Sequence, residues 1–200
     1  VGNPEKSYPV ILVTGTNGKG SVAANLDSIL TASGYKTGLF TSPHLVRYNE
    51  RVRINGKDLD DASIERHLRL IGQKIYFDFT TGLPTDSEKY LPLTFFEVTT
   101  ALALMAFKEA SVDVAILEIG LGGRLDATNA ADPVFTLITP VGYDHTTILG
   151  ETLSEIASEK AMTMRKNRPA LIAPMPDEAL KTLRKKASEI GSELFELNDD

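Results

Sequence analysis

Residues 8–21 read Y-P-V-I-L-V-T-G-T-N-G-K-G-S, and this segment sets the architecture of the chain. Residues 8–14 form an apolar run that stops at Gly15, which predicts a strand buried on both faces. Residues 21–33 then carry apolar side chains at helical spacing and stop before Gly34, which predicts a helix. The first local unit is therefore a buried strand, a glycine-rich turn and a helix.

The turn has the composition of a phosphate-binding loop. Its glycines let the backbone curl so that several N–H groups face one anion, and the following helix presents the positive end of its dipole. Lys19 can reach the outer phosphates of a nucleotide, and the Ser21 hydroxyl can bind Mg²⁺. The alternative is a glycine-rich turn that contains Lys19 by chance. We predict an ATP-binding loop formed by Gly15, Thr16, Asn17, Gly18, Lys19, Gly20 and Ser21.

Strands and helices alternate along the rest of the chain. Strands are predicted at residues 36–41, 113–119, 134–139, 170–173 and 193–197, helices at 62–76, 95–108, 152–164 and 177–190, and a loop at 80–92. This alternation predicts an α/β fold of the P-loop NTPase-like type, a mostly parallel sheet with helices on both faces. Ligands of such sheets bind beyond the carboxyl ends of the strands. Ser42, His44, the glycines of 120–123 and His145 all follow predicted strands, so we expect one shared site there.

The composition excludes several classes of function. Lys and Arg number 21 and Asp and Glu 27, giving a formal net charge of −6, so general nucleic-acid binding is not expected. The absence of cysteine excludes disulfides and thiolate metal sites. No apolar run approaches the ~20 residues of a membrane span, and the first residues lack a signal-peptide pattern. We expect a cytoplasmic protein that has no membrane partner.

Three charged positions have both a structural and a functional interpretation. Glu97 follows Thr94 in a T-x-x-E pattern, which is also the capping box of a helix start. Lys160, taken alone, is typical of an exposed lysine on a helix surface. His145 follows Asp144, and such a pair is usually a satisfied polar contact. The residues alone do not decide among these interpretations.

Residues 118–129 read E-I-G-L-G-G-R-L-D-A-T-N and leave a predicted strand with three glycines. A tight loop with close backbone approach explains the glycines. Arg124 and Asp126 then form either a structural pair that shapes the loop or part of a functional site. Both interpretations stay open.

Together these segments resemble the folylpolyglutamate synthase/dihydrofolate synthase branch of the Mur ligase family. The strings that carry the resemblance occur in the family's order: T-G-T-N-G-K-G-S at 14–21, T-S-P-H-L at 41–45, R-Y-N-E-R-V-R-I at 47–54, L-T-F-F-E at 93–97, L-E-I-G-L-G-G-R-L-D-A-T-N at 117–129 and D-H-T-x-x-L-G-x-T at 144–152. S-P-H-L and the glycine string are specific to this branch, whereas the phosphate loop fits any Mur ligase. One departure follows Lys160, where Met162, Thr163 and Met164 replace the family's usual Gly and two branched apolar residues.

The resemblance implies an ATP-dependent amide ligase built on the Mur ligase central domain. ATP phosphorylates the carboxylate of dihydropteroate or a folate, and the amine of L-glutamate attacks the acyl phosphate, which releases ADP and phosphate. Phosphoryl transfer needs positioning and charge neutralisation more than covalent catalysis.

The resemblance also carries roles over to single positions. It implies catalytic roles for Lys19, Lys160 and His145. It implies that Mg²⁺ is held by Ser21, Glu97 and His145. It matches Lys160 to the lysine that family members carbamylate, and it matches Ser42, Pro43 and His44 to part of the folate-binding loop. Asn129 is placed near the nucleotide without a role.

The resemblance finally implies a domain arrangement. Residues 1–200 are expected to be one incomplete ATP-binding domain that lacks a C-terminal glutamate-ligase domain, and the protein is expected to be a monomer like its family. Two alternatives remain open. One is a cell-wall Mur ligase, which would be expected to carry G-K-T-[ST] in place of G-K-G-S. The other is a nucleotide-binding module or pseudo-enzyme without ligase activity.

Overall fold

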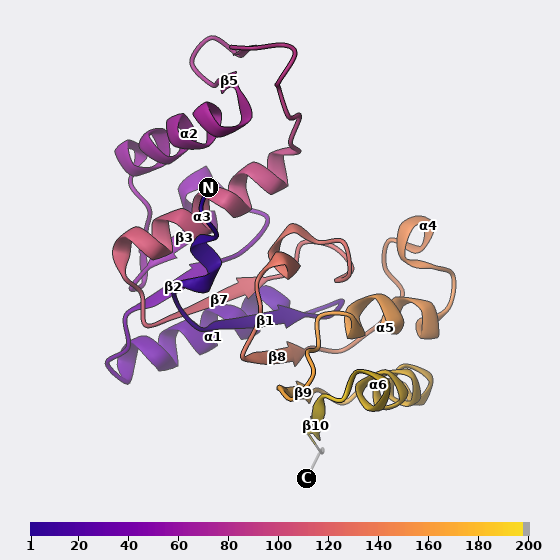
Figure 1. The fold of residues 1–200 in the computed structure, drawn as a ribbon. Helices are drawn as coiled ribbons and strands as arrows, with labels where there is room; N and C mark the ends of the chain where they lie inside the picture. The colour runs from indigo at the N-terminus through magenta and orange to yellow at the C-terminus, as the bar shows by residue number, and fades with distance from the viewer. Residues whose placement is uncertain (198–200) are drawn as a thin grey trace.

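One sheet forms the centre of the protein. Its strands are β1 (Val10–Thr14), β2 (Thr37–Phe40), β3 (Val52–Ile54), β4 (Lys57–Asp58), β7 (Val114–Glu118), β8 (Phe135–Ile138), β9 (Pro169–Ile172) and β10 (Glu193–Glu196). Their order is β10-β9-β8-β1-β7-β2-β3-β4 (Figure 1). In this computed structural model, which describes residues 1–197, the pairs from β10 to β2 are parallel, whereas β3 and β4 pair antiparallel. The predicted mostly parallel sheet is confirmed.

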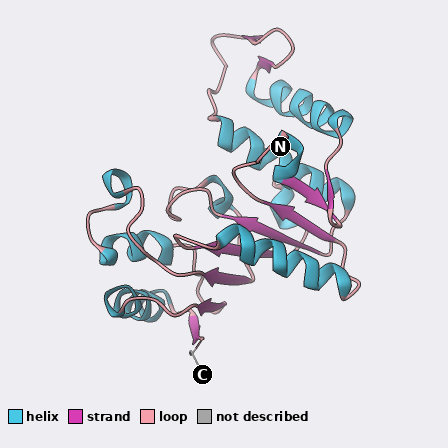
Figure 2. Ribbon diagram, turned by 180° about the vertical axis from the view of Figure 1, so that it is seen from behind, coloured by secondary structure: helices cyan, strands magenta, loops and turns pink. Residues whose placement is uncertain are grey.

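Helices cover both faces of the sheet, as predicted. They are α1 (Lys19–Ala32), α2 (Asp61–Ile75), α3 (Phe95–Ala110), α4 (Thr146–Leu149), α5 (Leu153–Ala161) and α6 (Asp177–Ile190). α1 lies against one face of the sheet (Figure 2), and Val13 and Leu39 pack with it there. Leu12 and Phe40, the adjacent strand positions, belong to the core that α2 and α3 cover on the other face, because successive side chains of a strand point to opposite faces.

The second half of the chain extends the α3 side of the sheet. Thr14 of β1 is in register with Ile138 of β8, so Ile138 lies on the same face as Leu12. Ile138 and Ile172 pack under α5 and α6 in a separate core. The carboxyl ends of β1, β7, β8 and β2 therefore meet at one edge, where the loops that follow them can form a site.

Several short elements were not predicted. β3 and β4 extend the sheet beyond β2, but strands of two or three residues are too short to show alternation in the sequence. β5 (Phe77–Asp78) and β6 (Leu83–Pro84) form a separate hairpin partly within the predicted 80–92 loop. The short helices η1 (Pro4–Lys6), η2 (Tyr48–Arg51), η3 (Ala127–Ala130) and α4 also lacked a signal.

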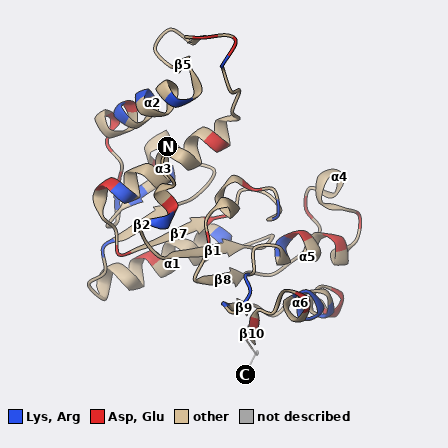
Figure 3. Cartoon of the chain, in the orientation of Figure 1, with Lys and Arg blue, Asp and Glu red and all other residues tan. Residues whose placement is uncertain are grey.

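Charges of both signs are interspersed on the outer turns of α2 and α6 (Figure 3). Arg69 pairs with Glu65 on α2, and Lys186 pairs with Glu189 on α6. The solvent-facing sides of these two helices therefore carry mixed charges rather than a patch of one charge sign. Within residues 1–197, no helix combines the length and the apolarity that crossing a bilayer requires.

Candidate active site

The predicted phosphate loop has the geometry that its glycines require. Gly15 has φ 139° and Gly18 has φ 83°, both in the region that favours glycine. A Cβ on Gly15 would overlap the Thr139 side chain, so only glycine fits beside β8. Gly18 is the N-cap of α1, which places the loop at the positive end of that helix.

The loop is also tied to the segment after β8. The Thr16 hydroxyl donates to the Gly142 carbonyl oxygen at 3.0 Å and accepts from the Gly142 amide at 3.0 Å. Lys19 is the first residue of α1, and its Nζ donates to the Thr16 carbonyl oxygen at 3.1 Å. The phosphate loop and the loop before His145 therefore form one unit, as expected from their positions after β1 and β8.

Lys160 does not lie on the solvent-facing side of its helix. Lys160 is only 3% exposed, and its Nζ donates a hydrogen bond of 2.8 Å to the Gly15 carbonyl oxygen. Burial and the neighbouring Lys19 charge lower the pKa of Lys160 to about 8, against a smaller raising effect of Asp144. The interpretation as an exposed surface lysine is wrong, because the last turn of α5 points this side chain at the phosphate loop.

Glu118 is the buried carboxylate at the phosphate loop. It ends β7 and is 4% exposed. Its Oε2 accepts from the Ser42 amide at 2.9 Å, and a Cβ on Gly20 would lie 3.4 Å from its Oε1. Burial raises the pKa of Glu118, while the Ser42 amide and the Lys19 charge oppose that rise. Glu118, Lys19 and Lys160 thus gather around one loop.

The loop after β2 is organised by its own charged residues. Glu50 accepts hydrogen bonds from the amides of Leu45, Val46 and Arg47 at 2.7–3.0 Å. Arg51 donates from Nε to His44 Nδ1 at 2.7 Å. Of the predicted folate-binding residues, His44 is therefore directed at Arg51, and its ring also lies edge-on to Tyr48.

A pocket of about 630 Å³ adjoins this loop. Ser42 and Pro43, two of the predicted folate-binding residues, line it, whereas His44 does not. Phe95 and Phe96 supply aromatic surface, and Arg51 lies over the Phe95 ring at 5.3 Å from its centroid. The opposite wall is the glycine loop, residues 120–127. The pocket can take a flat aromatic molecule next to a buried guanidinium.

The glycine loop is shaped by Asp126 rather than by an Arg124–Asp126 pair. The Asp126 Oδ2 accepts from the amides of Gly120 and Leu121, each at 2.9 Å. Arg124 instead donates to Glu159 Oε1 on α5 at 2.9 Å. Of the two interpretations left open, the Arg124–Asp126 structural pair is wrong: Asp126 closes the loop on itself, and Arg124 joins the loop to α5.

Glu97 forms the capping box at the start of α3, which is the structural alternative for its sequence pattern. Its Oε2 accepts from the amide and the hydroxyl of Thr94, both at 2.7 Å, and the Thr94 hydroxyl accepts from the Glu97 amide at 3.2 Å. These bonds lower the pKa of Glu97. Ser21 is exposed on the first turn of α1. A metal-binding role for Ser21, Glu97 and His145 remains a prediction.

His145 adopts a left-handed backbone conformation with φ 46° before α4. Its Nε2 lies 3.5 Å from Asp144 Oδ1. The side chain is 55% exposed. Among residues 1–197, no three His, Cys, Asp or Glu side chains converge closely enough to hold a metal by themselves.

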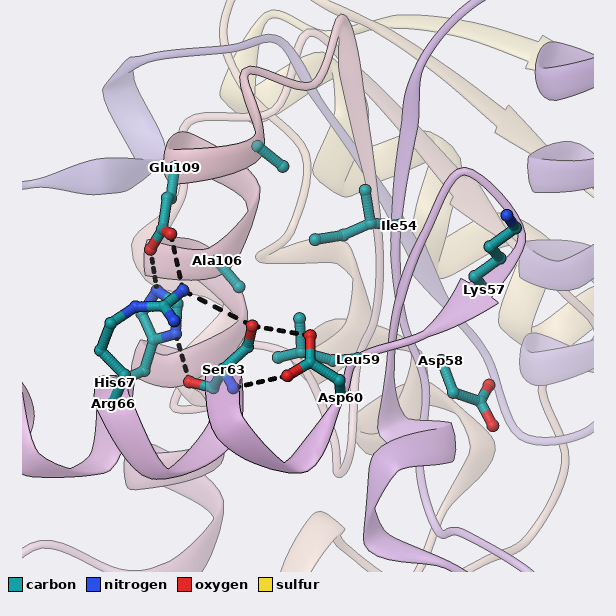
Figure 4. Close-up of a pocket in the computed structure, with 11 residues that line it drawn as sticks. Ile54, Lys57, Asp58, Leu59, Asp60, Ser63, Arg66, His67, Ala106 and Glu109 are labelled. Carbon is teal, nitrogen blue, oxygen red and sulfur yellow. Dashed lines mark hydrogen bonds and ion pairs between the residues drawn. The ribbon is translucent and has the colours of Figure 1, made fainter.

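A second hollow lies between β4, α2 and α3 and contains none of the predicted site residues. The buried His67 ring joins the two helices there: Nδ1 contacts the Ser63 carbonyl oxygen at 2.7 Å, and Nε2 contacts Glu109 Oε2 at 3.0 Å (Figure 4). Arg66 also bonds Glu109, at 2.6 Å. Asp60, Ser63, Arg66, His67 and Glu109 are paired with one another, which is typical of a helix contact.

The comparisons with known proteins decide the family. Residues 13–199 match the family described as the Mur ligase middle domain. The chain belongs to the Mur ligase family. The dihydrofolate synthase/folylpolyglutamate synthase of Bacillus subtilis is 40% identical to this Mur ligase chain, over 100% of the chain and 45% of the relative.

Two solved structures agree with this Mur ligase assignment. Folylpolyglutamate synthase from Thermotoga maritima has a TM-score of 0.85 and 35% identity, covering 100% of this chain and 44% of that one. E. coli FolC in complex with DHPP and ADP has a TM-score of 0.83 and 39% identity, covering 96% and 44%. The Mur ligase chain thus spans about half the length of these relatives. Their names favour the folylpolyglutamate synthase branch over the cell-wall branch.

The sequence did not single out two residues of this Mur ligase site. Glu118 was only part of a motif, although a carboxylate at the end of an otherwise apolar buried strand was a usable signal, because such a charge needs a partner. Arg51 was also hidden in a motif. Its signal is weaker, since nothing in the local pattern distinguishes it from Arg47 and Arg53.

Proposed function

We propose that the complete protein containing this chain is an ATP-dependent amide ligase that joins L-glutamate to dihydropteroate, to a folate, or to both. The observation that carries this proposal is the meeting of Lys19, Glu118 and Lys160 at a phosphate loop, next to a pocket with aromatic walls. The names of the relatives supply the substrate class.

The proposed reaction has two steps. A carboxylate oxygen of the pteroyl acid attacks the γ-phosphorus of ATP, the bond to ADP breaks, and an acyl phosphate forms. The glutamate amine then attacks the acyl carbon, the carbon–oxygen bond to phosphate breaks, and the amine loses a proton. Lys19 lies where it can neutralise charge on the outer phosphates, and Lys160 lies beneath the same loop.

Mg²⁺ fits the donors at this loop. Magnesium is usually held by one or two carboxylates together with substrate phosphates, and Glu118 offers a carboxylate under Gly20. We assign this carboxylate role to Glu118, because Glu97 is engaged by Thr94, and the Ser21 hydroxyl on α1 remains a predicted ligand. His145 remains the predicted ligand of a second ion. When bound, Mg²⁺ would neutralise charge on the phosphates.

The pocket lined by Pro43, Phe95 and Phe96 is the proposed site of the pteridine and aminobenzoyl rings. Ser42 bonds Glu118 and also lines this pocket, so the pocket opens toward the phosphate loop. A flat acid bound there can direct its carboxylate at the γ-phosphate, which is the positioning that phosphoryl transfer needs.

A second domain is part of the proposal. Because the chain spans about half of its relatives, we propose that glutamate binding and closure of the site need sequence outside residues 1–200. The acyl phosphate must meet glutamate in a site closed to water. The 200-residue chain alone is therefore expected to bind nucleotide weakly and not to turn over. Monomeric assembly and a cytoplasmic location remain expectations.

An ADP-release assay on the complete protein tests the proposed function. ADP release should require ATP, glutamate and either dihydropteroate or tetrahydrofolate, and omission of any one should abolish it. A UDP-sugar peptide should not replace the pteroyl substrate; if it does, the cell-wall alternative is correct. Nucleotide binding without release of ADP under all conditions would favour the binding-module alternative.

A further inference from the structure

Arg165 joins two segments that flank the candidate site. It follows α5 and is partly buried, with its side chain 25% exposed. Its Nη1 donates to the carbonyl oxygens of Met162, Thr163 and Met164 at 3.1, 3.1 and 3.2 Å. These carbonyls form the turn directly after Lys160, so one side of the guanidinium caps the end of α5.

The other side of the guanidinium holds the segment that directly follows the glycine loop. Nη2 of Arg165 donates to Asn129 O and Asn129 Oδ1, both at 2.9 Å, and to Ala131 O at 3.1 Å. Asn129 in turn donates from Nδ2 to the carbonyl oxygens of Arg124 and Met162 at 3.3 and 3.4 Å. We call Arg165, Asn129 and the carbonyls they contact the arginine clamp.

The arginine clamp lies beside a close contact between the glycine loop and α5. A Cβ on Gly123 would lie 2.6 Å from Glu159 O and 3.2 Å from the Lys160 Cα. The glycine loop thus lies directly against the turn of α5 that carries Lys160. Arg124 adds an ion pair with Glu159 at 2.9 Å, but its side chain is about half exposed, so that pair alone contributes little.

Lys160 depends on this arrangement because its own anchor is a single hydrogen bond to Gly15. Its ammonium is buried, and burial disfavours that charge. Without a fixed helix end, the long side chain could move out toward water. The Thr163 hydroxyl also bonds the Lys160 carbonyl oxygen at 2.7 Å, and the clamp holds the carbonyl of Thr163 itself.

We propose that Arg165, acting with Asn129, is a positioning residue that holds Lys160 under the phosphate loop and fixes the glycine loop wall of the substrate pocket. The link to catalysis rests on the proposed function, whereas the effect on Lys160 does not. Lysine at this position cannot replace arginine, since one ammonium cannot span both sets of carbonyls as a planar guanidinium does.

The first experiment reads the position of Lys160 without any assay of activity. The protein is treated briefly with acetic anhydride, and acetylation at each lysine is measured by mass spectrometry. Lys160 should be protected in the wild type and labelled several-fold faster in Arg165→Ala, Arg165→Lys and Asn129→Ala. Lys166→Ala, a neighbouring exposed cation, should leave Lys160 protected. Ile71→Val, a core change on the buried face of α2, controls for lower global stability.

The second experiment measures ligase kinetics in the complete protein. Arg165→Lys should lower kcat by about 10–100-fold, the scale found when a residue that orients a metal ligand is lost, with little change in the KM for ATP. Unchanged Lys160 labelling in folded Arg165 variants, or equal labelling in Ile71→Val, overturns the proposal. Increased labelling with unchanged kcat also overturns it. A wild type that never ligates, but shows the labelling pattern, contradicts the proposed function and leaves the clamp supported.

Discussion

The Nζ of Lys160 donates a 2.8 Å hydrogen bond to the carbonyl oxygen of Gly15, so the last turn of α5 is tied to the first glycine of the phosphate loop. The two residues lie far apart in sequence and meet because β1 and β8 are neighbours in the sheet. A buried lysine directed at a phosphate loop is unlike the exposed lysine that its local sequence predicts. This relationship makes Lys160 a candidate for chemistry.

Carbamylation of Lys160 should depend on pH. The reaction with CO₂ needs the neutral amine, and burial lowers the pKa of Lys160 from 10.5 to about 8. Carbamate should therefore increase as pH rises through about 8 at constant dissolved CO₂, rather than near the ordinary lysine value. Carbon-13 NMR with labelled CO₂ measures it, with Lys160→Arg as the control that cannot form a carbamate. A carbamate signal that persists in Lys160→Arg would exclude Lys160 as its site.

Substitutions of Glu118 and Glu97 should have different effects on magnesium-dependent activity. Glu118→Gln should lower kcat by about 100-fold or more, the scale for losing a group that stabilises transition-state charge, and should weaken the Mg²⁺ dependence of nucleotide binding. Glu97→Gln should leave both nearly unchanged and should cost little stability, because glutamine at this helix position can still accept the hydrogen bonds of Thr94. Calorimetric titration with ATP, with and without Mg²⁺, separates them. The reverse pattern would restore Glu97 as the ligand.

The sequence predicted the sheet, but it did not predict Glu118 as the magnesium ligand. The apolar runs identified β1, β2, β7, β8, β9 and β10, and α1, α2, α3, α5 and α6 came from helical spacing and capping signals. These predictions agree with the fold because the elements are long enough to show a clear hydrophobic pattern. β3 and β4 escaped prediction because the pairing of a strand of two or three residues depends on its neighbour rather than on its own pattern.

The site could be predicted only where one segment carries the chemistry. The phosphate loop is such a segment, because its glycines and Lys19 are contiguous. Glu118, Lys160 and Gly15 meet through tertiary packing, and Glu97 satisfies its own helix start with the same carboxylate that a metal would need. A capping box and a metal ligand have the same sequence pattern, so the side-chain geometry had to distinguish them.

Replacing Arg51 should weaken binding of the acid substrate more than binding of ATP. It is 8% exposed and lines the aromatic pocket, with its Nε committed to His44. Arg51→Met should raise the KM for dihydropteroate or folate by about 10-fold or more, since a hydrogen bond to a charged group is worth ~1.5–3 kcal/mol. Arg47→Met, an exposed neighbour paired with Asp61, is the matched control. An equal rise in the KM for ATP would argue against a pocket role.

Lys19 should be required for phosphoryl transfer but not for folding. Its Nζ has only the Thr16 carbonyl oxygen as a hydrogen-bond partner among the described residues. Lys19→Ala should therefore abolish ADP release while changing stability by less than ~0.5 kcal/mol. Thermal unfolding and the ADP assay are run on the same preparation. Near-normal turnover in this variant would remove the phosphate loop from the mechanism.

In the proposed reaction, a pteroyl carboxylate becomes an acyl phosphate and is then joined to glutamate. Dihydropteroate with ¹⁸O at both carboxylate oxygens tests this most directly in the complete protein, with ATP, Mg²⁺ and glutamate present. The proposed chemistry breaks the bond between the acyl carbon and the oxygen attached to phosphorus. Mass spectrometry should therefore find one ¹⁸O in each released phosphate and the glutamylated product in equal amount. Product formed with no ¹⁸O in phosphate, or phosphate released with no glutamylated product, would contradict the account.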